Sequence, residues 1–182
     1  MRRVAATNTT HDTTQNTRHD RSKAKNTRPA RRHAHEQRAP GRRITSGDLG
    51  IQLSRRTEAE YFKWFLACLL FGKPIQQKVA ARAYFTCIAA GLMSPSAITA
   101  AGWDKIVAVL DSAQYVRYDF STATKLLDIS RELSETYGSL TRLFAQSRDA
   151  ADLSARLQAF KGIGPVTARI FLADLAPILF GK

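Results

Sequence analysis

The residues of this chain that are best suited to chemistry lie together at positions 160–169, in the segment FKGIGPVTAR. Two glycines, Gly162 and Gly164, flank the apolar Ile163, and Pro165 follows at once, with apolar helical patterns on both sides. Glycine tolerates backbone angles that other residues avoid, and it has no side chain to keep a ligand away. Proline suits the first position of a helix, so a second helix is predicted to begin at Pro165. The segment therefore predicts a turn between two helices that presents backbone N–H groups to a phosphate.

The side chains around this turn fit the same chemistry. Lys161 and Arg169 add positive charge, and Ile163 can point inward and hold the two helices together. The amides that follow Pro165 lie in the first turn of the second helix, where the helix dipole favours an anion. The residues predicted to contact nucleic acid are Lys161, Gly162, Ile163, Gly164, Val166, Thr167 and Arg169. The alternative is an ordinary corner between two helices, with glycine at the C-terminus of the first.

Residues 160–168 resemble the helix-hairpin-helix of the base-excision DNA glycosylases related to endonuclease III. The similarity extends over about residues 57–176. Residues 66–81 resemble the first barrel helix of that family and the loop after it, and residues 106–137 resemble its short helix, aromatic loop and long helix. The resemblance implies a six-helix, barrel-like domain. Its hairpin would hold the DNA backbone, and a pocket beside the hairpin would receive a flipped base.

The catalytic residues of that family are matched less well. In members that also cleave the strand, a lysine just before the Thr-Ala pair attacks the sugar carbon and forms a Schiff base. The resemblance puts Val166 at that position, and valine carries no nucleophile. Members that use water keep an aspartate roughly two dozen residues beyond the hairpin glycines or slightly fewer, which would put it near Lys182. We therefore expect no strand cleavage by this route.

Because of these departures from the family, no catalytic residue is assigned. Two carboxylates remain as candidates. Asp174 is the only carboxylate after the hairpin, but it lies earlier than the aspartate of the family, within the second helix. A solvated or salt-bridged surface residue is the favoured interpretation of Asp174. Asp119 is the other candidate. The second lobe of the family and its cysteine cluster would lie beyond Lys182.

A predicted loop before the long helix mixes aromatic and cationic side chains: Tyr115, Arg117, Tyr118 and Phe120. Aromatic and guanidinium groups stack on exposed bases. The same side chains can instead cap the helical core, and the sequence leaves both interpretations open.

Two glutamines, Gln76 and Gln77, follow the break after the first predicted helix. The related enzymes place groups near this point that fill the gap left by an extruded base. A polar start to the next helix is the commoner explanation. Trp103 is predicted to lie in the core, since large aromatic side chains dominate core packing.

Positive charge is concentrated at the N-terminal end of the chain. Residues 1–43 hold 12 Lys and Arg residues against three acids and include all four histidines, whereas the remainder holds 16 against 12 acids. Because residues 1–43 contain almost no large apolar side chain, a disordered basic tail is predicted at 1–50, ahead of a helical domain at 51–182. Such a tail favours a polyanion such as DNA. A merely solvated tail is the alternative.

Cofactors and membranes are not expected. Cys68 and Cys87 each lie in an apolar helical pattern, and no CxxC pair exists. An iron–sulfur or zinc site made of thiolates is therefore excluded within this sequence, and no metal site is predicted. The longest apolar run, residues 61–71, is shorter than the about 20 residues that cross a bilayer. We expect a cytoplasmic, nucleoid-associated protein.

The pattern from residue 57 onward is helical, and strand-type alternation is essentially missing. Thr57 and Glu60 form a capping-box pattern, and Ser94 with Pro95 and Ser121 are further predicted starts. Helices are predicted at 57–71, 75–90, 95–101, 103–110, 121–137, 140–146, 152–159 and 165–175. The predicted fold class is all-α, a six-helix barrel-like domain that ends in a helix-hairpin-helix.

These features together favour a protein that binds the phosphate backbone of duplex DNA with little sequence preference. Two alternatives remain open at this point. One is a divergent or truncated base-excision DNA glycosylase. The other is a helical protein–protein interaction module in which the hairpin only packs helices.

Overall fold

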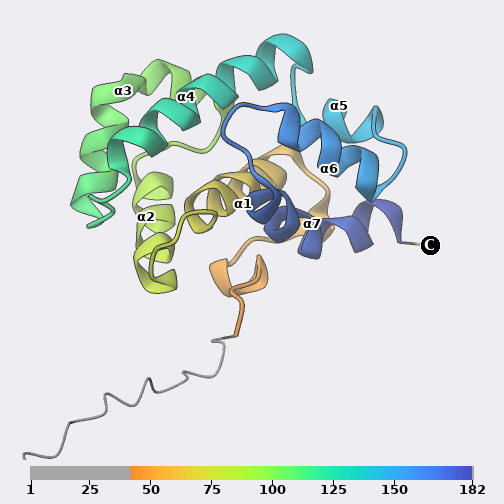
Figure 1. Cartoon of the computed structure of the whole chain (residues 1–182), viewed down its shortest axis with the longest axis horizontal. Coiled ribbons are helices and arrows are strands. Elements are labelled where there is room, and N and C mark those ends of the chain that lie inside the picture. The colour runs from red at the N-terminus through yellow and green to blue at the C-terminus, as the bar shows by residue number, and fades with distance from the viewer. Residues whose placement is uncertain (1–41, 182) are drawn as a thin grey trace, which may run out of the picture. The chain divides into compact units, whose positions relative to one another are not determined.

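The computed structural model describes residues 42–181, and within this range the chain is helical, without a strand (Figure 1). The all-α class predicted from the sequence is confirmed for these residues. Most of the predicted tail, residues 1–41, lies outside the described residues. The elements are η1 (Gly47–Leu49) and η2 (Leu53–Arg55), both 3-10 helices, followed by α1 (Glu58–Phe71), α2 (Gln77–Ala89), α3 (Pro95–Ser112), α4 (Asp119–Thr136), α5 (Leu140–Ala145), α6 (Ala150–Ala159) and α7 (Pro165–Phe180).

Helix α1 is the central helix of the described unit, and α2, α4, α5 and α7 all contact it (Figure 1). Ten of its 14 residues are buried, because its sequence is apolar on nearly every face. Side chains such as Trp64, Phe65 and Leu66 each contribute about 1.5–3 kcal/mol when fully buried. The Trp64 indole Nε1 also donates a hydrogen bond of 3.0 Å to the Phe171 carbonyl oxygen, which ties α1 to α7.

Most helices begin where a side chain caps them. Thr57, Ser94, Ser139 and Asp149 each accept a hydrogen bond from a backbone N–H three residues further along. The capping box predicted at Thr57 is only half formed. The Glu60 carboxylate turns away and accepts hydrogen bonds from the Gln52 N–H (2.6 Å) and the Lys63 ammonium (2.7 Å).

The predicted start of α4 is wrong by two residues. The helix begins at Asp119, with Tyr118 as its N-cap, instead of beginning after a cap at Ser121. Ser121 lies inside the first turn, where its hydroxyl donates to the Tyr118 carbonyl oxygen at 3.1 Å. A serine that bonds to the preceding turn is compatible with a helix interior, so its presence did not mark the boundary.

Helix α3 is interrupted at Gly102, whose φ of 75° and ψ of 171° are not helical. The interruption agrees with the two short helices predicted there. Trp103 follows it and is 39 % exposed, so the prediction that it lies in the core is wrong. Its ring packs against Phe120 with the centroids 5.3 Å apart, and its Nε1 donates to the Thr124 hydroxyl at 3.1 Å. The indole N–H thus finds its partner on the outer side of α4.

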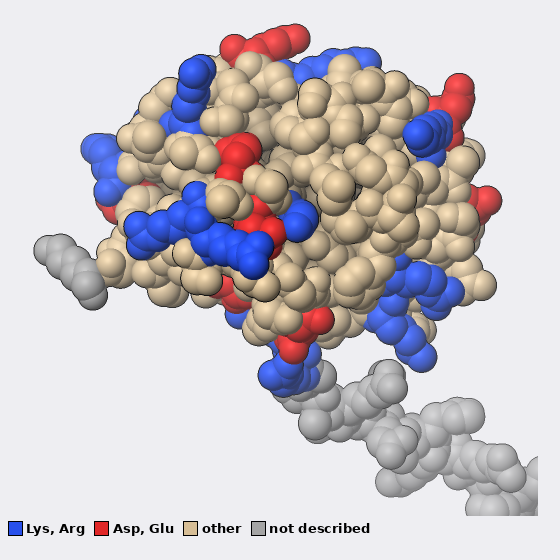
Figure 2. All heavy atoms as spheres, turned by 180° about the vertical axis from the view of Figure 1, so that it is seen from behind, with Lys and Arg blue, Asp and Glu red and all other residues tan. Residues whose placement is uncertain are grey.

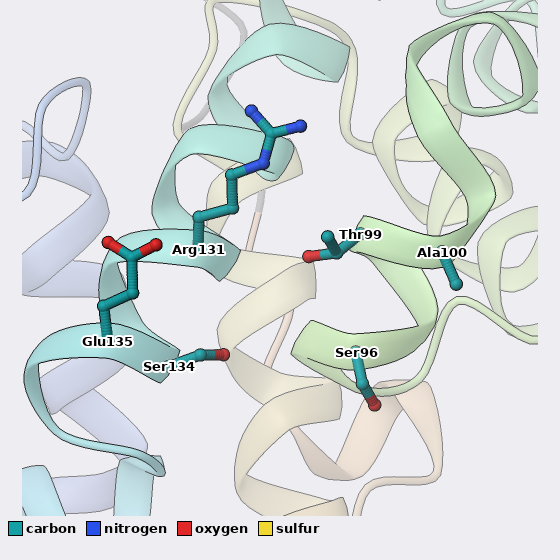
Figure 3. A pocket seen from close by; sticks show the side chains of 6 residues that line it. All are labelled: Ser96, Thr99, Ala100, Arg131, Ser134 and Glu135. Carbon is teal, nitrogen blue, oxygen red and sulfur yellow. The ribbon is translucent and has the colours of Figure 1, made fainter.

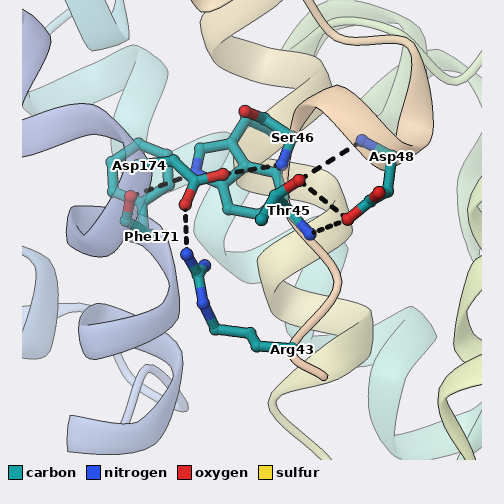
Figure 4. A network of polar contacts seen from close by, with 7 residues as sticks. Arg43, Thr45, Ser46, Asp48, Phe171 and Asp174 are labelled. Atoms are coloured by element: carbon teal, nitrogen blue, oxygen red, sulfur yellow. Dashed lines mark hydrogen bonds and ion pairs between the residues drawn. The ribbon is translucent and has the colours of Figure 1, made fainter. Parts of the chain in front are cut away.

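The segment before α1 is attached to α7 by a network of polar contacts (Figure 4). The Arg43 guanidinium donates to one carboxylate oxygen of Asp174 at 2.5 Å, and the Ser46 N–H donates to the other at 2.6 Å. Leu49, in the same segment, is buried. Residues 42–50, which the sequence analysis grouped with the tail, therefore hold a short helix and contacts with the helical unit.

Helix α7 is longer than predicted. It was expected to end near Leu175 and instead continues to Phe180, with Pro177 inside its last turn. No helix among residues 42–181 combines the length and the apolar character that crossing a membrane requires.

Candidate nucleic-acid interface

The turn between α6 and α7 is narrow and depends on one glycine. Helix α6 ends at Ala159, and the Ile163 N–H donates to the Phe160 carbonyl oxygen at 3.0 Å, which closes the turn. Gly162 has φ of 97°, a conformation that side-chain-bearing residues rarely adopt. Ile163 is 5 % exposed and packs into the core, as predicted. The glycine and the inward isoleucine together fix how α7 leaves the turn.

Of the two properties expected of the turn glycines, Gly164 contributes the missing side chain and not a special backbone angle. Its φ of −96° and ψ of 175° are ordinary extended values, so a special backbone angle does not explain it. A Cβ placed on Gly164 would meet nothing within 4 Å. Gly164 is the N-cap of α7 and has no side chain to cap the helix, so the N–H groups of its first turn lack a side-chain acceptor. The consequence is an open, uncapped helix N-terminus that faces free space.

Three exposed side chains surround this N-terminus: Lys161, Val166 and Arg169. Val166 is 46 % exposed and offers only apolar surface. Thr167 differs from the others because it is 3 % exposed and its hydroxyl faces α1. Of the residues predicted to contact nucleic acid, Lys161, Gly162, Val166 and Arg169 lie exposed at the turn, whereas the Ile163 and Thr167 side chains point into the protein.

Gly72, at the end of α1, explains how the N-terminus of α7 is positioned. A Cβ on Gly72 would lie 2.1 Å from the Thr167 hydroxyl oxygen, so any larger residue would collide with α7. In the sequence, Gly72 is only part of the break after the first predicted helix. A glycine with an ordinary φ of −70° carries no local signal of a close approach, and the contact is visible only in three dimensions.

A group of cations beside the turn was also missed. It consists of Lys73 and Arg117, which lie over the ring of Tyr118, and Lys125, whose amine the Lys73 charge affects, and it is called the cation cluster below. Lys73 Nζ and the Arg117 guanidinium carbon each lie 5.4 Å from the centroid of the Tyr118 ring. Burial, and then the charge of Lys73, lower the pKa of the Lys125 amine to about 8. These residues come from two segments far apart in the sequence, so no linear motif marks them.

The structure separates the residues of the predicted base-stacking loop. Tyr115 is fully buried, and its hydroxyl donates to the Leu70 carbonyl oxygen at 2.7 Å. It therefore lies in the core, which is one of the two interpretations that the sequence left open. Arg117 is exposed and Tyr118 is partly buried between the cations. The exposed aromatic ring of this region is that of Phe120, at 59 % exposure.

The two candidate carboxylates are occupied by other contacts. Both oxygens of Asp174 accept hydrogen bonds, from Arg43 and from the Ser46 N–H, and its side chain is only 10 % exposed. This is the salt-bridged role favoured for Asp174, and it attaches the N-terminal segment to α7. Asp119 accepts the N–H of the neighbouring Phe120 at 2.6 Å, at the start of α4. Both oxygens of Asp174 are thus engaged, and one oxygen of Asp119 is engaged within its own helix.

The thiols and the described acids form no obvious metal site. Cys68 and Cys87 are buried, and burial raises the pKa of both, that of Cys87 to about 12. In the part of the chain that the structure describes, no group of three His, Cys, Asp or Glu side chains could hold a metal ion.

Hollows elsewhere on the unit are small or open. The larger, of about 450 Å³, lies between α3 and α4, and Figure 3 shows its polar side chains Thr99, Arg131 and Glu135. The smaller, of about 90 Å³, is lined partly by Phe71, Gln77 and Ile170. Gln76 and Gln77 are both exposed near the start of α2. The gap-filling role considered for these glutamines stays a prediction.

Charge is not spread as a continuous stripe over the face that Figure 2 shows. Basic and acidic side chains lie there in separate small groups, with a broad uncharged area between them. No family model, no curated protein and no solved structure matches the chain.

Proposed function

We propose that the protein binds the phosphate backbone of duplex DNA through the turn between α6 and α7. The observation that carries the proposal is the uncapped N-terminus of α7 at Gly164, which faces open space. Lys161, three residues before Gly164, and Arg169, five residues after it, are both exposed. A helix N-terminus with free N–H groups favours phosphate through both hydrogen bonds and the helix dipole.

On this proposal, α6, the turn and α7 act as a helix-hairpin-helix. The domain around them would be the six-helix, barrel-like unit of the glycosylase superfamily. The order of the helices from α1 to α7, the interruption of α3 and the long α4 before the turn support this assignment. The resemblance of residues 160–168 to the family's hairpin supports it independently.

Binding of this kind does not depend on the base sequence of the DNA. Backbone N–H groups and Lys or Arg side chains that contact phosphates position the protein on DNA without distinguishing bases. The affinity should fall steeply with salt, because each neutralised phosphate releases counterions. The basic residues of the N-terminal 50 positions would add to this attraction. We therefore propose a nucleoid-associated role, with no metal ion or cluster in the interface.

We propose further that the protein does not cleave the strand through a lysine at the hairpin, since that position holds Val166. A glycosylase that uses water would need a free carboxylate near the turn, and the contacts of Asp174 and Asp119 argue against both candidates. This alternative predicts release of a base from duplexes that contain damaged bases. An absence of release across a panel of lesions would eliminate it.

The test of the proposal replaces Gly164 with Asp. An aspartate at the N-cap would accept the N–H groups of α7 and stabilise the helix, but it would repel a phosphate. We expect the affinity of Gly164→Asp for a duplex to fall about tenfold or more, as loss of a charge-assisted hydrogen bond costs about 1.5 kcal/mol or more. The stability should not fall, and fluorescence anisotropy and thermal unfolding measure the two properties.

Gly47→Asp is the matched control for the change in net charge. Gly47 lies in η1, and a Cβ there would meet only one atom within 4 Å, at 3.8 Å. If both variants lose affinity equally, the turn is not the contact. If residues 42–182 alone show no affinity at physiological salt, the attraction belongs to the basic tail, and the protein–protein interaction alternative is favoured.

A further inference from the structure

The cation cluster lies directly against the turn. Lys125 projects from α4 toward the turn, and its Cε lies 3.1 Å from a Cβ placed on Gly162, so its methylene groups cover that glycine. Lys73 lies near enough for its charge to contribute to the lowered pKa of the Lys125 amine. Lys125 joins the cluster to the turn, because it packs against Gly162, two residues before the N-cap of α7.

No recorded ion pair of residues 42–181 neutralises a cation of the cluster. The recorded ion pairs of residues 42–181 involve Asp48, Glu60, Asp152 and Asp174, and none of these acids pairs with a cation of the cluster. Two like charges held together in a partly buried place oppose each other, and each disfavours the charged form of the other. A bound anion would remove this repulsion, whereas any other occupant would leave it.

We propose that Lys73 and Lys125, with Arg117, form a subsite for one phosphate group beside the α6–α7 turn. This inference rests on the proposed function, and it assigns a second backbone phosphate of the same nucleic acid to the cluster. The N–H groups of the turn bind one phosphate, and the two lysines together bind a second phosphate of the same nucleic acid. A subsite of this kind would explain why three cations lie together without a recorded ion pair.

The position of the subsite favours a phosphate over a protein carboxylate. The cluster adjoins free N–H groups at a helix N-terminus, which together with lysines are the usual partners of phosphate. Tyr118 holds Lys73 and Arg117 by cation–π contacts rather than by ion pairs, so their donors stay available for a ligand. A free phosphate ion would fit the same chemistry, and the experiment separates it from DNA.

The subsite makes DNA affinity depend on pH in one direction. Bound phosphate favours the charged amine and raises the pKa of Lys125 above its free value of about 8. The affinity should therefore be full below pH 7 and fall as the pH rises through 8 toward the pKa of the bound state. The charged and titratable groups to consider near Lys125 are Lys73, whose charge lowers its pKa, and Tyr118, over which Lys73 lies. Asp128 follows three residues later on α4, and Lys161 precedes Gly162, against which Lys125 packs.

The experiment uses the full chain and measures duplex affinity against salt and pH. Lys125→Arg, which keeps its charge, should make affinity nearly independent of pH between 7 and 9, while the wild-type protein loses several-fold. The double change Lys73→Met with Lys125→Met should lower the salt slope by about one, because one phosphate contact accounts for about 0.9 of that slope. The double change Lys105→Met with Arg131→Met, on exposed side chains of α3 and α4, removes the same two charges and controls for net charge.

Three results would overturn the subsite. A salt slope of Lys73→Met with Lys125→Met equal to that of Lys105→Met with Arg131→Met would show that no phosphate is held there. A salt slope lower by about two would show that the two lysines contact two separate phosphates. An equal pH dependence of Lys125→Arg and the wild-type protein would exclude Lys125 as the titrating contact. The pKa of Lys125, followed by NMR in the wild-type protein, should rise with the duplex and needs no variant to fold. A comparable rise with inorganic phosphate alone at the same phosphate concentration would assign the site to the free ion.

The subsite and the proposed function can fail separately. If Gly164→Asp loses affinity but the lysine variants match their control, the turn binds DNA and the subsite is wrong. If neither set of variants differs from its control, both proposals are wrong.

Discussion

The two ends of α7 differ in how their polar groups are bonded to the rest of the protein. Toward its C-terminus the helix is fastened to the N-terminal segment, because Asp174 holds Arg43 and the Ser46 N–H, and the Ile178 carbonyl oxygen accepts from Arg56 at 2.7 Å. At its N-terminus Gly164 provides no cap. The one carboxylate that follows the turn is thus used to hold the structure.

The difference shows why Asp174 and Gly164 should respond differently to substitution. Groups at the fastened end already have their hydrogen-bond partners within the protein, so changing them should alter stability. Groups at the open end lack them, so changing them should alter binding. Four substitutions can break or sharpen this contrast.

Gly72→Ala should have the largest effect on stability. Its new Cβ would lie 2.1 Å from the Thr167 hydroxyl oxygen and 3.1 Å from the Cys68 carbonyl oxygen. We expect a loss of about 3 kcal/mol, at the upper end of the range for overpacking a core. Urea denaturation measures it, and Gly47→Ala is the control. Equal stability of the two variants would show that α1 and α7 do not approach as closely as described.

Asp174→Ala should have the next largest effect, about 1–3 kcal/mol, because it leaves the partly buried Ser46 N–H without its acceptor. The affinity for DNA should not fall. Asp111→Ala, on an exposed residue near the end of α3, is the control and should leave stability nearly unchanged. A large loss of DNA affinity or of base release with intact stability would instead give Asp174 a functional role.

The smallest contrast lies between the two glycines of the turn. Gly162→Ala should cost about 1–2 kcal/mol, because alanine is strained at a φ of 97°. Its Cβ would also press on Lys125. Gly164→Ala should cost less than half of that, since its φ is ordinary and the space beside it is open. Thermal unfolding measures both. A larger loss for Gly164→Ala would contradict the open N-terminus.

The sequence predicted the helical class and most helix positions because the signals are local. Ser94 before Pro95 marks the start of α3, and apolar residues that recur every three or four positions mark α4. It also predicted that Ile163 is buried, since an apolar residue between two glycines has only the core to enter. Local capping and periodicity are the part of folding that a single sequence displays most directly.

The parts that the sequence did not predict depend on contacts between distant segments. The cation cluster joins Lys73 to Lys125, and the exposure of Trp103 depends on Thr124 on the next helix. The two turn glycines look alike in sequence, yet only Gly162 has a left-handed backbone. The path of α7 decides which glycine needs the left-handed backbone and which one needs to lack a side chain. That path depends on the close approach of α7 to Gly72 at the end of α1.

The most direct test of the central claim is an NMR titration of ¹⁵N-labelled protein with a short duplex. If the open N-terminus of α7 binds DNA, the amide resonances of Gly164, Val166 and Thr167 should shift most within residues 42–181. The resonances around Asp174 should shift little. Shifts of these turn amides no larger than those around Asp174, or no shifts among residues 42–181 while the duplex is bound, would contradict binding at the open end of α7.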